Sequence, residues 1–139
     1  MGIVNIGTDI VECVRIAGMI ERHGEHFLSR VFTPTEITYC QSHRQVVERF
    51  AGRFAAKEAI LKTLGTGWRN GLSWLEMEIL NQKTGRPVVG LSGAALAHAE
   101  RIGIRSILIS ISHCRTHASA FAIGLEEGQH AQVSIESAE

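Results

Sequence analysis

Hydrophobic and polar residues alternate in short runs at both ends of this chain. Residues 3–6 form a β-branched run that ends just before Gly7-Thr8-Asp9. This run predicts a strand with Asp9 at its carboxyl end, where a side chain can face a ligand. Alternation predicts four further strands, of which the first two form a hairpin and the last two are joined by a tight turn: 75–79, 88–91, 106–112 and 118–124.

A helical period runs through the middle of the chain. Apolar residues between 14 and 20 predict a short amphipathic helix that is broken at Gly24 and exposes Arg15 and Arg22. Three further helices are predicted, each with a capping residue or a glycine at an end: 34–43, 46–64 and 92–102. Together the patterns predict a domain of mixed α and β structure.

Composition limits the classes of protein. With 139 residues, 45% of them hydrophobic, the chain has the size of one domain, which we place at 1–126. The remainder, 127–139, is an acidic tail that we expect to be solvated and mobile. Fourteen basic residues balance fourteen acidic ones, which disfavours nucleic acid binding by bulk charge. Three widely spaced cysteines and the lack of an export or membrane signal predict free thiols and a cytoplasmic location.

An acidic residue interrupts the apolar side of the helix over 46–64. At about 100° per residue, Glu58 falls on the side that carries Val47, Phe50, Ala51, Phe54 and Leu61. A buried carboxylate is costly, so Glu58 needs a cationic partner, a metal ion or a place at the open edge of this side. Helix geometry alone favours an ion pair with Lys62, four residues on. Arg53 and Lys57 project from the other side, where a solvated face is expected.

Asp9 allows two interpretations. An aspartate after Gly-Thr at the end of a strand is often a turn residue that bonds its own backbone. If the fold brings Asp9 to Glu58, however, the two carboxylates form an oxygen site suited to Mg²⁺, which would also bind substrate phosphates. Lys62 would then neutralise phosphate charge.

The sequence also contains an H-C-x-x-H cluster at His113, Cys114 and His117. Such spacing can bind zinc on a helix, but here it follows a predicted strand and lacks further ligands. A turn histidine and a phosphate or substrate contact are the alternatives.

Three segments together resemble the 4′-phosphopantetheinyl transferase family, in particular its short, standalone holo-acyl-carrier-protein synthase branch. They are G-T-D-I-V-E at 7–12, R-F-A-A-K-E-A-I-L-K at 53–62 followed by G-T-G at 65–67, and S-I-S-H at 110–113. Their order and spacing match across nearly the whole chain. The R-F-A-A-K-E-A stretch is highly specific, whereas the other two segments are weak alone. Gln45 departs from the family, whose members often carry a basic residue there.

The resemblance implies a role for particular residues. Asp9 and Glu58 would hold Mg²⁺, and Lys62 would contact the phosphates of coenzyme A. The remaining contacts to coenzyme A would come from Arg53, Gly65, Thr66, Gly67 and His113. Arg15 and Arg22 would belong to the docking surface for an acidic carrier protein.

The resemblance also implies a compact α+β domain that assembles as a homotrimer with active sites between subunits. The implied reaction transfers 4′-phosphopantetheine from coenzyme A to a serine of acyl carrier protein, in support of fatty acid biosynthesis. Glu58 and a metal-bound water are both possible general bases. Two other classes stay open: a binding module without turnover, and a metal-regulated interaction protein that uses the histidine cluster.

Overall fold

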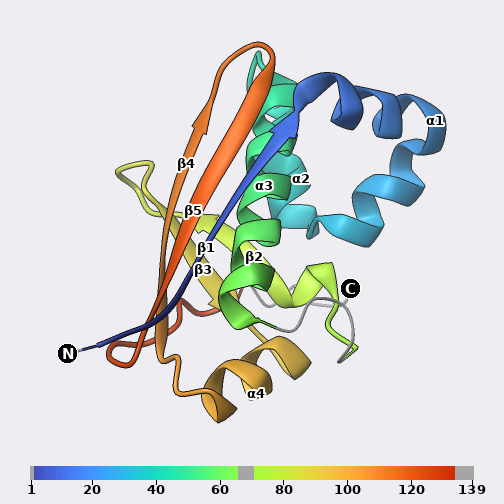
Figure 1. The fold of residues 1–139 in the computed structure, drawn as a ribbon. Helices are drawn as coiled ribbons and strands as arrows, with labels where there is room; N and C mark the ends of the chain where they lie inside the picture. Colours follow the sequence, from blue (N-terminus) through green and yellow to red (C-terminus); the bar gives the residue numbers. More distant parts are fainter. Residues whose placement is uncertain (1, 66–70, 134–139) are drawn as a thin grey trace.

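A three-stranded antiparallel sheet with a long helix on one face forms the centre of the molecule (Figure 1). The computed structural model describes residues 2–65 and 71–133. The elements are β1 Ile3–Glu12, α1 Cys13–Val31, α2 Pro34–Gln41, α3 Val46–Leu64, η2 Trp74–Glu76, β2 Met77–Asn81, β3 Pro87–Leu91, α4 Gly93–Arg101, β4 Ser106–His113 and β5 His117–Leu125. The sheet order is β1-β5-β4, and β2 pairs with β3 in a separate hairpin. The predicted α+β class with a single compact domain is confirmed.

Strand β1 is longer than the sequence predicted. It continues to Glu12, and Asp9 lies inside it, opposite Ala120 of β5. Gly7 does not end the strand. A glycine is needed there because β1 passes close to α3: a Cβ atom at this position would lie 2.1 Å from the carbonyl oxygen of Ala59. The prediction that Asp9 ends the strand, and the alternative that it is a turn residue, are both wrong.

Helices α1 and α2 begin and break where local signals place them. Gly24 interrupts α1 with φ 49° and ψ −128°, as predicted, although helical structure then resumes to Val31. A capping box starts α2: the Glu36 amide donates to Thr33 Oγ1 at 3.2 Å, and the Thr33 amide donates to Glu36 Oε1 at 2.8 Å. These two helices lie on the side of α3 that faces away from the sheet (Figure 1).

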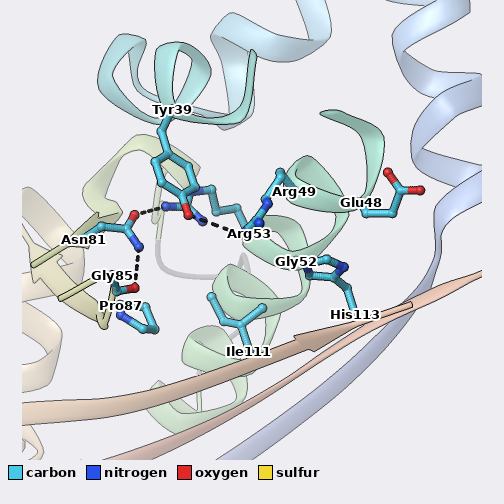
Figure 2. A pocket seen from close by; sticks show the side chains of 10 residues that line it. All are labelled: Tyr39, Glu48, Arg49, Gly52, Arg53, Asn81, Gly85, Pro87, Ile111 and His113. Carbon is cyan, nitrogen blue, oxygen red and sulfur yellow. Dashed lines mark hydrogen bonds between the residues drawn. The ribbon is translucent and has the colours of Figure 1, made fainter. Parts of the chain in front are cut away.

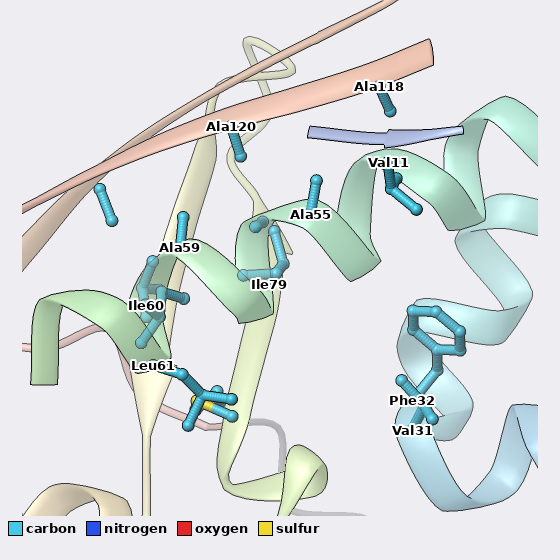
Figure 3. Packing of buried hydrophobic residues seen from close by; sticks show 14 of the residues in the cluster. Val11, Val31, Phe32, Ala55, Ala59, Ile60, Leu61, Ile79, Ala118 and Ala120 are labelled. Atoms are coloured by element: carbon cyan, nitrogen blue, oxygen red, sulfur yellow. The ribbon is translucent and has the colours of Figure 1, made fainter. Parts of the chain in front are cut away.

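Helix α3 has the bounds that the sequence predicted. Gly65 ends it in the left-handed conformation, with a φ of 76°. Figure 3 shows Ala55 and Ala59 of α3 directed toward Ala118 and Ala120 of β5. These small side chains are fully buried, so they allow the helix to pack closely on the sheet.

The expectation of a solvated face on α3 is wrong. Arg53 is 4% exposed and Lys57 is 0% exposed, because α1, α2 and β2 cover the side of α3 that faces away from the sheet. Two of the residues assigned to the apolar side, Val47 and Phe54, are only partly buried. In the second half of α3, the side that is most exposed to solvent carries Phe54, Glu58 and Lys62. Glu58 therefore occupies an open edge of the helix, which was one of its three alternatives.

The two predicted hairpins and α4 are present, but the strand predicted at 75–79 begins at Met77, because Trp74–Glu76 form η2. The capping of α4 also differs from the prediction. Ser92 stands at the N-cap of α4, but its side chain makes no capping hydrogen bond. The Glu76 carboxylate accepts from the Ala94 amide instead. This contact ties η2 to the start of α4.

The chain after β5 runs back over the rest of the domain as far as the structure describes it. The Ala131 amide donates to the Val89 carbonyl of β3 at 3.1 Å, and His130 Nε2 lies 3.3 Å from the Ile104 carbonyl oxygen. Residues 134–139 of the expected mobile tail lie outside the described residues.

Cys13, Cys40 and Cys114 are free thiols, as predicted. Among the described residues, no helix is long and apolar enough to span a membrane.

Candidate active site

Three polar side chains meet where β1 passes α3. The Lys62 ammonium lies 3.0 Å from Asp9 Oδ1 and donates to the Thr8 carbonyl oxygen at 2.9 Å. Asp9 is largely shielded, with 18% of its side chain exposed, whereas Lys62 is 54% exposed. Lys62 thus pairs with Asp9, and the expected i,i+4 pair with Glu58 is not formed in the described part of the chain.

Glu58 lies beside this pair. Partial burial raises the pKa of the Glu58 carboxyl above its ordinary value, and the negative charge of Asp9 raises this pKa further. Lys62 and Arg15 oppose this shift, so both cations are also close to Glu58. Within residues 2–65 and 71–133 the Glu58 carboxylate has no hydrogen bond or ion pair. Two mutually repelling carboxylates next to one lysine form a site that a further cation would stabilise.

The donor set fits a hard divalent cation. Asp9 and Glu58 supply carboxylate oxygens, which Mg²⁺ prefers, and Mg²⁺ commonly binds through one or two carboxylates with water and phosphate oxygens. No group of three or more histidine, cysteine, aspartate or glutamate side chains gathers in the described ranges, so neither this site nor the H-C-x-x-H segment forms an all-protein metal cage there.

A separate cavity of about 140 Å³ opens on the other flank of α3 (Figure 2). Its walls come from α2, α3, the β2–β3 hairpin and β4, and its lining includes Tyr39, Arg49, Arg53, Asn81 and His113. Arg53 donates to the Asn81 side-chain oxygen, and its guanidinium lies 3.9 Å from the centre of the Tyr39 ring. The Nε atoms of Arg49 and Arg53 are buried without a hydrogen-bond partner among the described residues. Two guanidinium groups in the wall of one cavity suit a phosphate.

Asp9, Glu58 and Lys62, which we call the acidic cluster, lie on the opposite flank of α3 from the cavity. In the sheet, Asp9 stands opposite Ala120, and His113 stands opposite Ala118. All four face α3, but β5 separates β1 from β4, so the two outer strands are roughly 10 Å apart. None of Asp9, Glu58 and Lys62 lines the cavity that His113 lines. A single chain therefore brings Asp9, Glu58 and Lys62 together but keeps His113 apart from them.

The remaining site residues from the sequence have simpler positions. Arg15 and Arg22 are exposed on α1, as predicted. Gly65 ends α3, and Thr66 and Gly67 lie outside the described residues. Sequence reasoning missed Tyr39 and Asn81, because no local pattern marks an aromatic or an amide that reaches a cavity only through the tertiary fold.

This fold and these two sites define a class of protein. The chain belongs to the 4′-phosphopantetheinyl transferase superfamily, since a sequence model of that family matches residues 5–137. Relatives named holo-[acyl-carrier-protein] synthase are similar over most of the chain. The protein from Koribacter versatilis is 47% identical over 121 residues, which are 87% of this chain and 97% of that protein, and the one from Solibacter usitatus is 44% identical over the same shares.

Solved structures of the same class share the fold. Holo-[acyl-carrier-protein] synthase from Neisseria meningitidis is 34% identical, with a TM-score of 0.80 over 89% of this chain and 99% of that one. The Helicobacter pylori protein, solved in complex with coenzyme A, is 33% identical, with a TM-score of 0.76 over 86% of this chain and 99% of that one.

Proposed function

We propose that this chain transfers the 4′-phosphopantetheine group of coenzyme A to a serine of apo-acyl carrier protein. The products are holo-acyl carrier protein and adenosine 3′,5′-bisphosphate. The observation that carries the proposal is the meeting of Asp9, Glu58 and Lys62 in a chain whose relatives bear the name of this activity. The coenzyme A complex of the similar Helicobacter pylori protein supports the choice of donor.

Asp9 and Glu58 would hold Mg²⁺, and the raised pKa of Glu58 is the structural reason to expect a cation there. When bound, the metal would stabilise the negative charge of the pyrophosphate. Lys62 would contact the same phosphates, because its side chain is about half exposed and its ammonium is already held beside Asp9. Gly65, Thr66 and Gly67 would let the backbone approach the ligand.

The reaction is a phosphoryl-type displacement. The serine oxygen of the carrier forms a bond to the phosphorus on the pantetheine side, and the bond from that phosphorus to the bridging oxygen breaks. The leaving group carries its electron pair away as adenosine 3′,5′-bisphosphate. The hydroxyl proton passes to Glu58 or to a water molecule beside it. Lys62 stabilises the developing charge by its fixed position.

The nucleotide end of coenzyme A would occupy the cavity on the β4 flank. Arg53 lines this cavity, and His113 is exposed at its rim. Arg49 supplies a second guanidinium group to the wall of the same cavity. Phosphate binding by paired guanidinium groups gives both charge and directed hydrogen bonds.

One ligand cannot easily reach both sites of the same chain, because α3 lies between them. A homotrimer resolves this if the acidic cluster of one subunit adjoins the cavity of the next. The sheet face opposite α3 offers an interface: Ile6, Ile10 and Phe121 are 65%, 67% and 61% exposed there. A patch of this kind on a folded chain commonly marks a protein interface. We therefore propose a homotrimer with interfacial active sites.

The carrier protein would dock on α1. Arg15 and Arg22 are exposed on this helix, and Arg15 is also close enough to Glu58 to affect its pKa. Positive charge beside the acidic cluster would orient an acidic carrier so that its serine enters the site. We place the activity in the cytoplasm, in support of fatty acid biosynthesis, with 1–126 as the catalytic domain.

Release of adenosine 3′,5′-bisphosphate from coenzyme A tests the proposal. The purified chain should release it only when apo-acyl carrier protein is present, in a one-to-one ratio with holo-carrier formed. A binding module without turnover would leave coenzyme A intact in both samples. Release without a carrier would instead indicate a hydrolase.

A further inference from the structure

Lys57 and Glu36 form an ion pair in the interior of the molecule that the proposed reaction does not use. Lys57 Nζ lies 2.7 Å from Glu36 Oε1, and both side chains are 0% exposed. Lys57 also donates to the carbonyl oxygens of Val31 at 2.7 Å and Trp74 at 3.1 Å. All three ammonium hydrogens therefore have acceptors.

Glu36 is satisfied by groups from separate segments. Its Oε1 also accepts from the Thr33 amide at 2.8 Å, and its Oε2 accepts from the Ile79 amide of β2 at 3.0 Å. The pair thus joins α2, α3 and β2 directly, and it reaches the end of α1 and η2 through Val31 and Trp74.

Stability alone is a weak reason for such a pair. Replacing a buried ion pair by apolar residues of similar volume is often neutral or stabilising, because burial removes both charges from water. What a buried, fully bonded pair does supply is a fixed arrangement of the elements that it joins. Lys57 also belongs to the specific R-F-A-A-K-E-A stretch, in which the reaction assigns roles only to its neighbours Arg53 and Glu58.

The same three elements supply three side chains to the cavity. Tyr39 lies one helical turn after Glu36 on α2, and Arg53 lies one turn before Lys57 on α3. Asn81 lies two residues after Ile79 on β2, so both residues are on one face of the strand.

The contacts in the cavity join the same elements as the buried contacts do. Arg53 of α3 bonds Asn81 of β2 and stacks on Tyr39 of α2, just as Lys57 and Glu36 link α3, α2 and β2 in the interior. Figure 2 shows Tyr39, Arg53 and Asn81 converging from these elements. The buried pair and the cavity contacts therefore link the same three elements at two neighbouring places.

We propose that Lys57 and Glu36 are positioning residues for the nucleotide cavity: their buried pair sets the spacing of α2, α3 and β2 at which Tyr39, Arg53 and Asn81 bind the nucleotide end of coenzyme A. This role rests on the proposed function. It predicts that loss of the pair weakens nucleotide binding more than it slows the chemical step, because Asp9, Glu58 and Lys62 lie on the opposite flank of α3.

The test uses the full chain with Lys57→Met/Glu36→Gln, which removes both charges and keeps an acceptor oxygen for a backbone amide. Adenosine 3′,5′-bisphosphate binding is measured by calorimetry, and KM for coenzyme A and kcat are measured well below the unfolding temperature. The expected result is a Kd and a KM at least tenfold higher, with kcat within threefold of the unaltered chain. Glu36→Gln alone leaves the Lys57 ammonium buried without its counter-ion, so it should lower the thermal midpoint more than the double variant does, and its Kd should be at least threefold higher.

Thr63→Val is the matched control. Thr63 is a fully buried polar residue of α3 whose hydroxyl donates to the Ala59 carbonyl at 2.9 Å and contacts that of Ala122 at 3.4 Å, so it serves only the helix and the sheet. This variant should lower the thermal midpoint without changing Kd or KM.

Two results would overturn the positioning role. One is a folded Glu36→Gln or double variant whose Kd and KM stay within twofold of the unaltered chain. The other is an equal rise in Kd for Thr63→Val, which would mean that any loss of core stability opens the cavity. If the unaltered chain itself neither binds the bisphosphate nor transfers phosphopantetheine, the proposed function fails instead.

Discussion

Glu58 is held where its charge is unfavourable. Partial burial and the neighbouring Asp9 both raise the pKa of its carboxyl, and the cations Lys62 and Arg15 compensate only in part. An uncharged residue at this position would fold more easily. Residues of a binding site often lower the stability of the folded protein, and Glu58 fits this pattern if its carboxylate binds a cation.

Glu58→Gln should therefore stabilise the metal-free protein while it abolishes transfer. Because the folded chain binds the Glu58 proton more tightly than the unfolded chain, ionisation of Glu58 lowers stability as pH rises from the ordinary carboxyl pKa through the raised one. In EDTA at pH 8 the thermal midpoint of Glu58→Gln should exceed that of the unaltered chain by about 1–4 °C. Thermal unfolding between pH 4 and pH 8 measures this difference, which should vanish at the acidic end.

Glu21→Gln is the control for this comparison, since Glu21 is exposed on α1. It should leave the midpoint unchanged across the range. A Glu58→Gln protein less stable than the unaltered chain at pH 8 would show that the Glu58 carboxylate is already satisfied without a metal.

At the scale of elements, the contact between β1 and α3 places Asp9 beside Glu58. Gly7 makes this contact possible, since a Cβ atom there would lie 2.1 Å from the Ala59 carbonyl oxygen and 2.9 Å from the Thr63 amide nitrogen. Both are helix backbone atoms, which cannot rotate away. The strand and the helix would have to separate to accept a side chain.

Gly7→Ala should accordingly destabilise the fold by about 3 kcal/mol or more, as overpacked cores do. It should also reduce transfer in the molecules that remain folded, because the distance between Asp9 and Glu58 would change. Urea unfolding and activity per folded molecule are the two measurements. Gly103→Ala is a useful comparison, since its strain comes only from a φ of 83° and nothing lies within 4 Å of the added atom. Equal effects of both variants on activity would argue against a special role of the β1–α3 contact.

Elements with local signals were predictable from the sequence. The Thr33 capping box and Gly65 fix the start of α2 and the end of α3, and both act through their own backbone neighbours. The approximate extents of β4 and β5 follow from alternation, because one face of the sheet packs on α3 and the other does not.

Tertiary contacts account for what the sequence left out. Gly7 resembled a strand end because its reason for being glycine lies in α3. Lys57 resembled a solvated residue because its partners, Glu36 and the Trp74 carbonyl, come from distant segments. The sequence pattern raised Asp9 and Glu58 as one possible metal site, and resemblance to a family made that alternative the favoured one. Tyr39 and Asn81 of the cavity needed the fold itself.

At the scale of the whole molecule, the proposed trimer depends on the open face of the sheet. Phe121 is central to it, with 61% of its surface exposed on the middle strand β5. Phe121→Glu should weaken assembly by about a hundredfold or more, as expected for loss of a buried aromatic anchor and introduction of a charge. Size-exclusion chromatography with light scattering should show a shift from three times the 15.2 kDa chain mass toward one.

Activity should fall together with assembly in this variant, because the acidic cluster would lose the cavity of its neighbour. Phe121→Leu keeps an apolar side chain and should keep both assembly and activity. A monomeric Phe121→Glu protein with full activity would contradict the interfacial active site, although not the transferase activity itself.

Intact-mass spectrometry of an apo-acyl carrier protein tests the central claim most directly. The carrier is incubated with this chain, coenzyme A and Mg²⁺, in parallel with EDTA and with Asp9→Ala and Glu58→Ala proteins shown to be folded. The account predicts that the carrier gains the mass of one phosphopantetheine only with the unaltered chain and Mg²⁺. No gain with several carriers would contradict the transferase function, and full gain in EDTA or with either variant would contradict the metal site at Asp9 and Glu58.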